Sequence, residues 1–254
     1  MSVTPEQRHV IDCVVSIFET GRIPTAASYG TCSVLDDNAG ISYGKHQCTD
    51  RAGTLDLVCK RYIELNGQQA ESLKQYMNYL ATNESTKYGS NTSKYPAWLN
   101  SLINLLKSAG SDKLMQQAQD EIFNSNYWNP AVDHCINIGL TSALGHLVIY
   151  DTCIHSGPGR ISSLRAKFPE KSPANGGDEK VWVIAFLNTR RAWLASSSNT
   201  LVQKTVYRID AMLELVKANN WNLNTPLIVR KVKDRKSTRL NSSHVSESRM
   251  PSSA

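Results

Sequence analysis

Apolar residues recur at the three- and four-residue spacing of amphipathic helices along most of this chain. The clearest example begins at Thr4, which can cap a helix; Pro5 suits the first helical position, and Gln7 follows the cap by three residues. A run of apolar residues at helical spacing follows, made of Val10, Ile11, Val14, Ile17 and Phe18. Gly21 then suits a helix end. The spacing predicts a helix between Thr4 and Gly21.

The same spacing predicts further helices over 55–65, 69–81, 96–109, 112–123, 130–138, 141–153, 178–195 and 200–216. Residues 22–54 interrupt it, since they carry Gly30, Gly40, Gly44 and Gly53 among Tyr, Val, Ile and Ser. Such a stretch is typical of short strands joined by tight turns. We therefore expect an α+β fold that is mainly helical, with a small sheet. A chain of 254 residues can form one large domain or two lobes around a cleft.

The last part of the chain differs from the rest. Residues 234–254 are rich in Ser and Arg, lack aromatic residues and show no periodicity. Residues 236–250 resemble a translated cloning or sequencing adapter, and the alternative is a native disordered tail. We expect residues 1–233 to form the folded domain and residues 234–254 to be a disordered tail.

The composition argues against several classes of protein. Lys and Arg number 28 against 22 Asp and Glu, which gives a net charge of +6. No basic run with interleaved aromatic residues appears, so we expect no nucleic acid partner. No apolar run approaches the ~18 residues of a membrane span, so we expect no membrane partner. The N-terminus also lacks the apolar core of a signal peptide.

The cysteines and the motif search suggest no metal or cofactor. None of the six cysteines forms a CxxC pair, so a zinc site is not expected. Cys13, Cys59 and Cys153 sit in apolar stretches and are interpreted as core residues, although one or two disulfides among the six stay open. No P-loop, GxGxxG or HExxH motif occurs.

Two carboxylates stand where acid–base chemistry could use them. Glu19 falls in the last turn of the first predicted helix, where a negative charge faces the negative end of the helix dipole. Asp36 and Asp37 lie in the Gly-rich region, with Asp37 18 residues after Glu19. Glycan hydrolysis needs one carboxylic acid and one carboxylate on opposite sides of a cleft. The alternative is that the paired aspartates merely shape a turn.

A second candidate follows the most apolar predicted helix. His155-Ser156-Gly157-Pro158-Gly159 comes one helical turn after Asp151, so the carboxylate could orient the imidazole as a catalytic dyad. The alternative is a motif that ends the helix and packs. No GxSxG occurs, which argues against that type of serine hydrolase.

Read together, four stretches resemble the chitosanases of glycoside hydrolase family 46. The resemblance covers roughly residues 10–229, and its order and spacing are more specific than any one piece. The first stretch pairs Phe18-Glu19 with Asp37-Asn38-Ala39-Gly40-Ile41-Ser42, similar to the family's Glu and Asp-Gly-Arg-Gly-x-Thr. The second is Tyr127-Trp128-Asn129-Pro130-Ala131-Val132 with Gly139-Leu140, and the third runs from Ala143-Leu144-Gly145 to His155-Ser156-Gly157-Pro158-Gly159. The fourth is made of Gly176-Gly177-Asp178-Glu179, Phe186-Leu187, Arg190, Tyr207-Arg208-Ile209-Asp210 and Asn224-Thr225-Pro226-Leu227.

The resemblance implies a lysozyme-like fold of two helical lobes with a small sheet beside a cleft. It implies an inverting endo-hydrolase of chitosan or a related amino-sugar glycan, without a cofactor, acting as a monomer outside the cell. Glu19 would be the general acid, Asp37 the general base, and Ser42 would match the Thr that positions the attacking water. The candidate substrate contacts are Tyr29, Asp36, Lys45, His46 and His155.

The chain departs from the family pattern at two places. Ala39 stands where the family has Arg after its catalytic Asp. Arg190 and Arg208 match the arginines of a buried Arg–Glu–Arg network behind the acid, but residues 195–200, where the Glu would fall, contain no acid. Asp36 could also replace Asp37 as the base. A muramidase that cleaves peptidoglycan on the same fold, and a non-catalytic glycan-binding module, are therefore kept as alternatives.

Overall fold

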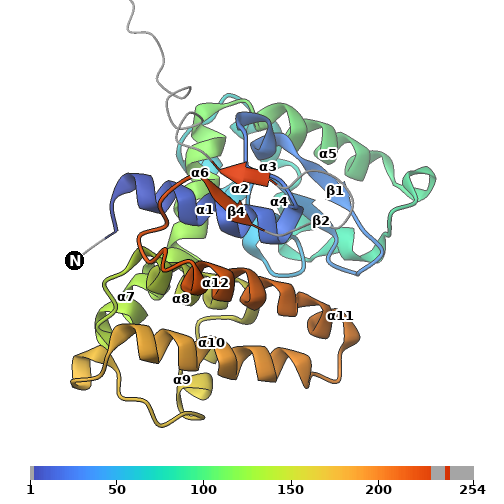
Figure 1. The fold of residues 1–254 in the computed structure, drawn as a ribbon. Coiled ribbons are helices and arrows are strands. Elements are labelled where there is room, and N and C mark those ends of the chain that lie inside the picture. Colours follow the sequence, from blue (N-terminus) through green and yellow to red (C-terminus); the bar gives the residue numbers. More distant parts are fainter. Residues whose placement is uncertain (1–2, 230–237, 241–254) are drawn as a thin grey trace, which may run out of the picture. The chain divides into compact units, whose positions relative to one another are not determined.

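The computed structural model describes residues 3–229 and 238–240, which fall into two compact units (Figure 1). Unit 1 combines the residues up to Ile23 with those from Tyr127 onward, and unit 2 spans Pro24–Asn126. The first helix of the chain therefore belongs with its C-terminal half. Both units are mainly helical, and unit 2 also holds a small antiparallel sheet, which confirms the predicted mainly helical α+β class.

Unit 1 is built around one buried helix. Its elements are α1 (Pro5–Thr20), α7 (Asn129–Ile138), α8 (Ala143–Ser156), α9 (Arg160–Arg165), η5 (Pro173–Asn175), α10 (Glu179–Ala195), α11 (Thr200–Gln203), η6 (Lys204–Val206), α12 (Tyr207–Lys217) and the antiparallel strands β4 (Leu227–Val229) and β5 (Thr238–Leu240). Every residue from Ala143 to Cys153 is buried, and α8 contacts α1, α7, α10 and α12. An apolar surface on all sides is what a central helix requires.

The N-terminal helix α1 forms where its capping signals predict. The Thr4 side chain accepts a hydrogen bond from the Gln7 backbone at 3.2 Å, and the Gln7 side chain accepts one from the Thr4 backbone at 2.9 Å. Gly21 ends the helix in the left-handed conformation, with φ 73°. These local signals place Glu19 in the last turn, with its side chain 41% exposed.

Unit 2 carries the interruption that its glycines predict. Its elements are η1 (Ala26–Gly30), β1 (Cys32–Val34), β2 (Ile41–Tyr43), β3 (Cys48–Thr49), α2 (Thr54–Glu64), α3 (Ala70–Lys74), α4 (Met77–Ala81), η2 (Glu84–Lys87), η3 (Thr92–Lys94), α5 (Ala97–Ala109) and α6 (Lys113–Phe123). A π-helical turn, Asn124–Trp128, leads from α6 to α7. Strand β2 lies between β1 and β3, and all its residues are buried.

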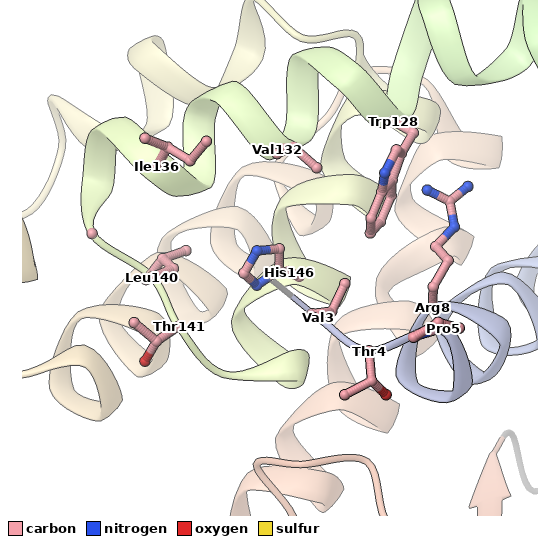
Figure 2. A pocket seen from close by; sticks show the side chains of 11 residues that line it. Val3, Thr4, Pro5, Arg8, Trp128, Val132, Ile136, Leu140, Thr141 and His146 are labelled. Carbon is pink, nitrogen blue, oxygen red and sulfur yellow. The ribbon is translucent and has the colours of Figure 1, made fainter. Parts of the chain in front are cut away.

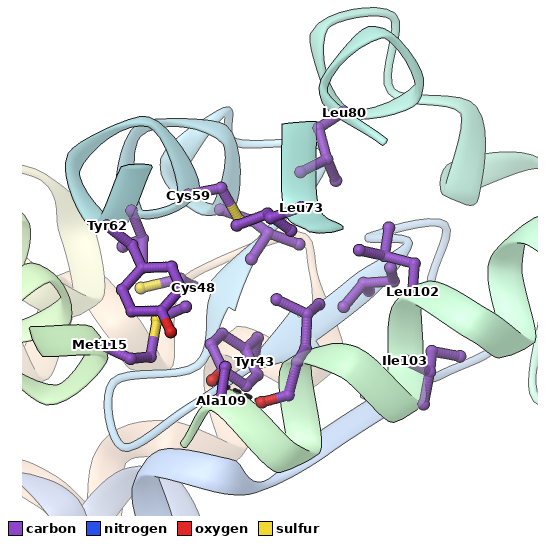
Figure 3. Packing of buried hydrophobic residues seen from close by; sticks show 14 of the residues in the cluster. Tyr43, Cys48, Cys59, Tyr62, Leu73, Leu80, Leu102, Ile103, Ala109 and Met115 are labelled. Atoms are coloured by element: carbon purple, nitrogen blue, oxygen red, sulfur yellow. Dashed lines mark hydrogen bonds between the residues drawn. The ribbon is translucent and has the colours of Figure 1, made fainter. Parts of the chain in front are cut away.

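The core of unit 2 packs the sheet against its helices (Figure 3). Tyr43, on the central strand, is fully buried and donates a hydrogen bond from its hydroxyl to the Leu106 carbonyl of α5 at 2.7 Å. Tyr62 of α2 is also buried, and its hydroxyl donates to Asp112 at 2.7 Å. Each buried phenol therefore has a partner, as a core tyrosine requires.

Two long helices expected from periodicity are broken. The helix expected over 69–81 is two, because backbone hydrogen bonds tighten to the i−3 carbonyl at Tyr76 and Tyr79. The helix expected over 200–216 is interrupted by η6, after which α12 starts at Tyr207. Helix α9 lies in a stretch for which no helix was expected.

The six cysteines are all free thiols, and Cys13, Cys59 and Cys153 lie in the core as interpreted. Within the described ranges, no cluster of His, Cys, Asp or Glu has the arrangement of a metal site. No described helix combines the length and apolar character that a membrane crossing needs. The expected disordered tail lies outside the described residues except for 238–240, which pair as β5 with β4.

Candidate active site

In unit 1, Glu19 is held by an arginine that is itself buried. Arg208 Nη1 lies 2.7 Å from Glu19 Oε1, and the Arg208 side chain is only 2% exposed. Glu19 Oε2 makes no hydrogen bond with any described residue, so one oxygen is fixed while the other is available. This is the arrangement that a carboxyl group needs if it is to present one oxygen to a substrate.

Behind this pair lies a charge network inside unit 1. Asp151, on α8, is fully buried and accepts from Arg208 Nε at 3.1 Å, from Arg208 Nη2, and from Arg190 Nη1 at 2.7 Å. Arg190 is also fully buried. Burial raises the pKa of Asp151, but the two guanidinium groups outweigh it and hold the pKa at about 2.

The acid between the two arginines comes from another part of the chain than residues 195–200. Residues 195–200 supply no acid, as the sequence shows, but Asp151 of α8 lies between the two arginines. The four groups Glu19, Asp151, Arg190 and Arg208 sum to zero charge when Glu19 is ionised and to +1 when it is protonated. Buried guanidinium groups require such compensation.

The first residues of α12 also fix the end of α1. The Tyr207 hydroxyl donates to the Phe18 carbonyl at 2.6 Å, and the two rings meet edge to face with centroids 6.1 Å apart. The Arg208 guanidinium carbon lies 5.1 Å from the centre of the Phe18 ring. Glu19 is therefore positioned by its neighbour Phe18 as well as through its own carboxylate.

His155 shares α8 with Asp151 but makes no dyad with it. Its Nδ1 lies 3.2 Å from Ser156 Oγ, while the Asp151 oxygens accept from the two arginines. Burial lowers the pKa of His155 to about 4, and the charges of Arg208 and Arg190 add to the effect. His155 is therefore neutral near pH 7, and the catalytic dyad considered from the sequence is not formed.

In unit 2, Asp37 lies exposed in the turn that connects β1 to β2. Its Oδ1 accepts a hydrogen bond from the Ala39 backbone at 3.0 Å, which makes a local Asx turn. Asn38 and Gly40 both take left-handed conformations, with φ 59° and 71°. The exposure of Asp37 suits a group that must activate a water molecule.

Asp36, its neighbour, is engaged differently. Asp36 Oδ1 accepts from the Ser90 backbone at 2.8 Å and Oδ2 accepts from Ser90 Oγ at 2.5 Å. The side-chain and backbone hydrogen bonds from Ser90 lower the pKa of Asp36. Of the two aspartates, Asp37 is thus the one without a partner outside its own turn.

Ser42 lies in β2, opposite Ser33 of β1 and Thr49 of β3. It is 6% exposed, and its hydroxyl makes no hydrogen bond with any described residue. The strand joins it directly to the turn that carries Asp37.

The remaining predicted contacts gather at the other end of β2. Asp120 of α6 accepts from the Tyr29 hydroxyl at 2.6 Å and from Lys45 Nζ at 3.3 Å, and lies 2.8 Å from His46 Nε2. The His46 ring stacks on Phe123 with centroids 3.8 Å apart. Burial raises the pKa of Asp120, but His46, Lys45 and Tyr29 together hold it at about 2.

Two aspartates outside the predicted set hold several of the predicted residues: Asp151 binds Arg190 and Arg208, and Asp120 binds Tyr29, Lys45 and His46. Asp151 has a detectable signal in the sequence, because a carboxylate in a predominantly apolar, buried helix must have a cationic partner. Asp120 has none, since it lies on the polar side of an ordinary amphipathic helix. Asp36 and Asp37 lie in the β1–β2 turn, whereas Lys45 and His46 lie in the β2–β3 turn.

Unit 1 also holds a cavity of about 630 Å³ near the start of α1 (Figure 2). Arg8 lines it and stacks over Trp128, with 3.4 Å between the guanidinium carbon and the ring centre. Its walls are mostly apolar, including Val132, Ile136 and Leu140. Because α1 rises about 1.5 Å per residue, the cavity lies some 20 Å from Glu19 at the other end of the helix.

Solved structures of similar fold are chitosanases. A mutant chitosanase from Bacillus subtilis MY002, described as complexed with 6 GlcN, matches with a TM-score of 0.75 and 29% identity over 90% of this chain and 96% of that one. A GH46 chitosanase from Gynuella sunshinyii, in complex with chitotetraose, matches with a TM-score of 0.76 and 26% identity over 92% and 97%. These likenesses confirm the lysozyme-like fold expected from the sequence.

Sequence comparison agrees with the fold. A chitosanase of Bacillus subtilis (strain 168) is 31% identical over 239 residues, covering 89% of this chain and 82% of that protein. A chitosanase of Streptomyces sp. (strain N174) is 27% identical over 233 residues, covering 88% and 78%. The model of glycosyl hydrolase family 46 matches residues 13–227. The chain, with its arginine-held Glu19 and its exposed Asp37, therefore belongs to glycosyl hydrolase family 46.

Proposed function

We propose that this glycosidase cleaves β-1,4 linkages within chitosan chains by an inverting mechanism, with Glu19 as the general acid and Asp37 as the general base. The observation that carries the proposal is the state of Glu19. Arg208 fixes one of its carboxylate oxygens at 2.7 Å, and the other has no described partner. A proton donor must be oriented in this way toward the leaving oxygen.

The acid side of the reaction uses the network behind Glu19. Protonated Glu19 gives its proton to the glycosidic oxygen as the bond to the sugar breaks, and is left as a carboxylate. The charge of Glu19, Asp151, Arg190 and Arg208 then changes from +1 to zero. Arg208 remains in contact with Glu19 Oε1 and keeps it oriented.

The base side uses the exposed turn of unit 2. Asp37 takes a proton from a water molecule, which attacks the anomeric carbon from the face opposite the leaving group and inverts its configuration. Ser42 presents a hydroxyl without a described partner on the adjoining strand and would hold that water. Asp36, whose two oxygens accept from Ser90, is assigned no part in the proton transfer.

The choice of chitosan rests on the relatives. Four of the similar proteins described above are chitosanases, and two solved ones were captured with GlcN or chitotetraose. Tyr29, Lys45, His46 and His155 would contact sugars away from the cleaved bond. A polysaccharide substrate is encountered outside the cell, so we propose that the enzyme acts there. We also propose that it acts as a monomer.

Parallel assays of wild type, Glu19→Gln and Asp37→Asn on chitosan and on purified peptidoglycan test the function. Reducing ends are counted, and NMR of the first products reads the anomeric configuration. We expect wild type to cleave chitosan and release the α-anomer, and each variant to lose about 10²–10⁴-fold in rate. Glu71→Gln, an exposed acid paired with Lys74, serves as the control and should keep full activity.

The outcomes separate the alternatives. Cleavage of peptidoglycan alone would replace the proposal with a muramidase, and the cationic Lys45 beside Asp120 would be the first place to seek the cause. Release of the β-anomer would rule out inversion. Binding of chitosan without hydrolysis would indicate a glycan-binding module.

A further inference from the structure

The turn that carries Asp37 is held on both sides by one segment of unit 2, residues 84–90. On the N-terminal side, both oxygens of Asp36 accept hydrogen bonds from Ser90, at 2.8 Å from its backbone and 2.5 Å from its hydroxyl. A Cβ at position 89 would collide with Asp36 Oδ1, so Gly89 is required for this approach. The Tyr95 hydroxyl in turn donates to the Gly89 carbonyl at 2.9 Å.

On the C-terminal side, the same segment holds the turn through Ser85. Its hydroxyl accepts from the Ile41 backbone at 2.8 Å and donates to Asp50 Oδ2 at 2.5 Å. Ser85 and Asp50 are both buried, at 1% and 0% exposure. A Cβ at Gly40 would collide with Ser85 Oγ, so Gly40 is needed for space as well as for its positive φ.

Further backbone bonds leave little freedom between these anchors. The Asp50 backbone donates to the Ile41 carbonyl at 3.0 Å, and the Arg51 backbone donates to the Ala39 carbonyl at 3.1 Å. Asp37 therefore lies between two fixed points, Asp36 before it and Gly40–Ile41 after it. Its carboxylate accepts a hydrogen bond only from the Ala39 backbone within the same turn, and the backbone that carries it is fixed.

We propose that Asp36 and Asp50 are positioning residues, which clamp the Asp37 turn onto residues 84–90 and thereby fix the general base. This inference rests on the proposed function, because it takes Asp37 to be the base. It gives Asp36 a part in catalysis that is neither proton transfer nor sugar binding. A misplacement of about 1 Å at a reacting group can cost about 10²-fold in rate, so loosening the clamp should lower kcat with little change in KM.

The variants follow from the contacts. Asp36→Ala removes both acceptors, whereas Asp36→Asn keeps one and offers its amide to the Ser90 hydroxyl. Ser90→Ala removes one donor and keeps the backbone N–H. The matched control is Asp112→Ala, which removes an aspartate of the same unit that accepts from Tyr62, Gln68 and Leu114. The Asp112 site lies outside the clamp, so its loss should affect stability without loosening the turn.

Two measurements are made on the whole protein. Steady-state kinetics on chitosan as a function of pH give kcat and KM, and amide hydrogen exchange reports on residues 37–41. We expect Asp36→Ala to lower kcat about 10- to 100-fold at nearly constant KM and to speed exchange at Ala39 and Ile41. Ser90→Ala should show a smaller effect of the same kind, and Asp36→Asn should recover most of the rate.

The proposal is overturned if Asp36→Ala loses no more rate than Asp112→Ala at matched stability, or if exchange in 37–41 is unchanged. It is also overturned if Asp36→Asn is as inactive as Asp37→Asn with a shifted pH profile, since Asp36 would then be the base itself. Wild type without activity on chitosan would instead refute the proposed function. The exchange data would still decide whether Asp36 clamps the turn.

Discussion

Arg208 links Glu19 to Asp151: its Nη1 contacts the Glu19 carboxylate at 2.7 Å, while its Nε and Nη2 donate to the buried Asp151. One guanidinium group therefore binds both the partly exposed Glu19 and the buried Asp151. Arg190 and Arg208 keep the buried Asp151 ionised. The negative charge of Asp151 offsets part of the positive charge with which Arg208 attracts the Glu19 carboxylate.

Arg190 and Arg191 are adjacent on α10 and allow a matched test of the buried network. Arg190→Ala should lower the free energy of unfolding by about 3–5 kcal/mol, because it leaves the Asp151 charge buried with one partner fewer. Arg191→Ala removes an exposed pair with Asp210 and should cost no more than about 1 kcal/mol. Urea denaturation measures both. Equal costs would mean that Asp151 does not depend on Arg190.

The free energy of unfolding should depend on pH through His155. Its pKa in the folded protein is about 4, below the ordinary 6.5, so the unfolded chain binds a proton more readily between these values. Stability should therefore fall as pH drops from about 6.5 to about 4. We expect His155 to contribute about 1–2 kcal/mol to this fall, since solvent reaches part of the side chain.

Denaturation of wild type and His155→Gln at pH 4, 5 and 6.5 measures this contribution. The variant should lose less stability than wild type on acidification. Parallel curves for the two proteins would show that the His155 proton is not coupled to folding.

The proposed role of the Ser42 hydroxyl can be tested by its effect on kcat with two matched substitutions. Ser42→Ala should lower kcat on chitosan about 10- to 100-fold with little change in KM, since one hydrogen bond to the attacking water is lost. Ser42→Thr keeps the hydroxyl and should retain most of the rate. If both variants behave alike in steady-state assays, the packing of β2 matters and the hydroxyl does not.

The charge of Lys45 should influence which form of chitosan the enzyme prefers. The Lys45 ammonium is paired with Asp120 of α6, so Lys45→Gln keeps hydrogen-bond donors but lowers the net charge of this group of residues by one. A polymer of protonated glucosamine should then be favoured, with kcat/KM on fully deacetylated chitosan rising about two- to tenfold at low salt. Added salt should reduce the gain.

Lys74→Gln is the control for this comparison, since Lys74 pairs with Glu71 on an exposed helix. Assays on fully deacetylated and on partly acetylated chitosan, at two salt concentrations, make the test. A loss of activity on both polymers would instead assign Lys45 a direct contact with the sugar.

Short-range sequence signals predicted where Glu19 and Asp37 lie in their helix and turn. The capping box at Thr4 and the left-handed Gly21 bound α1 and set Glu19 in its last turn, since these effects act within a few residues. The glycines of residues 22–54 predicted the turns, and Gly40 allows the conformation that exposes Asp37. Periodicity did not predict the 3-10 turn Lys204–Val206, or that the Tyr207 hydroxyl donates to the distant Phe18 carbonyl.

The sequence by itself determined most of the helices, the small sheet, and the places of Glu19 in a last helical turn and of Asp37 in a Gly-rich turn, because capping, turn chemistry and amphipathic spacing are short-range. Only the tertiary structure decided what holds them. Asp151 is 39 residues from Arg190 and 57 from Arg208, and Asp36 is 54 from Ser90. Such pairs form only when packing brings distant segments together. A buried charge is stable only with a partner of opposite charge or a hydrogen bond. The fold supplies that partner, and the spacing of residues along the sequence does not.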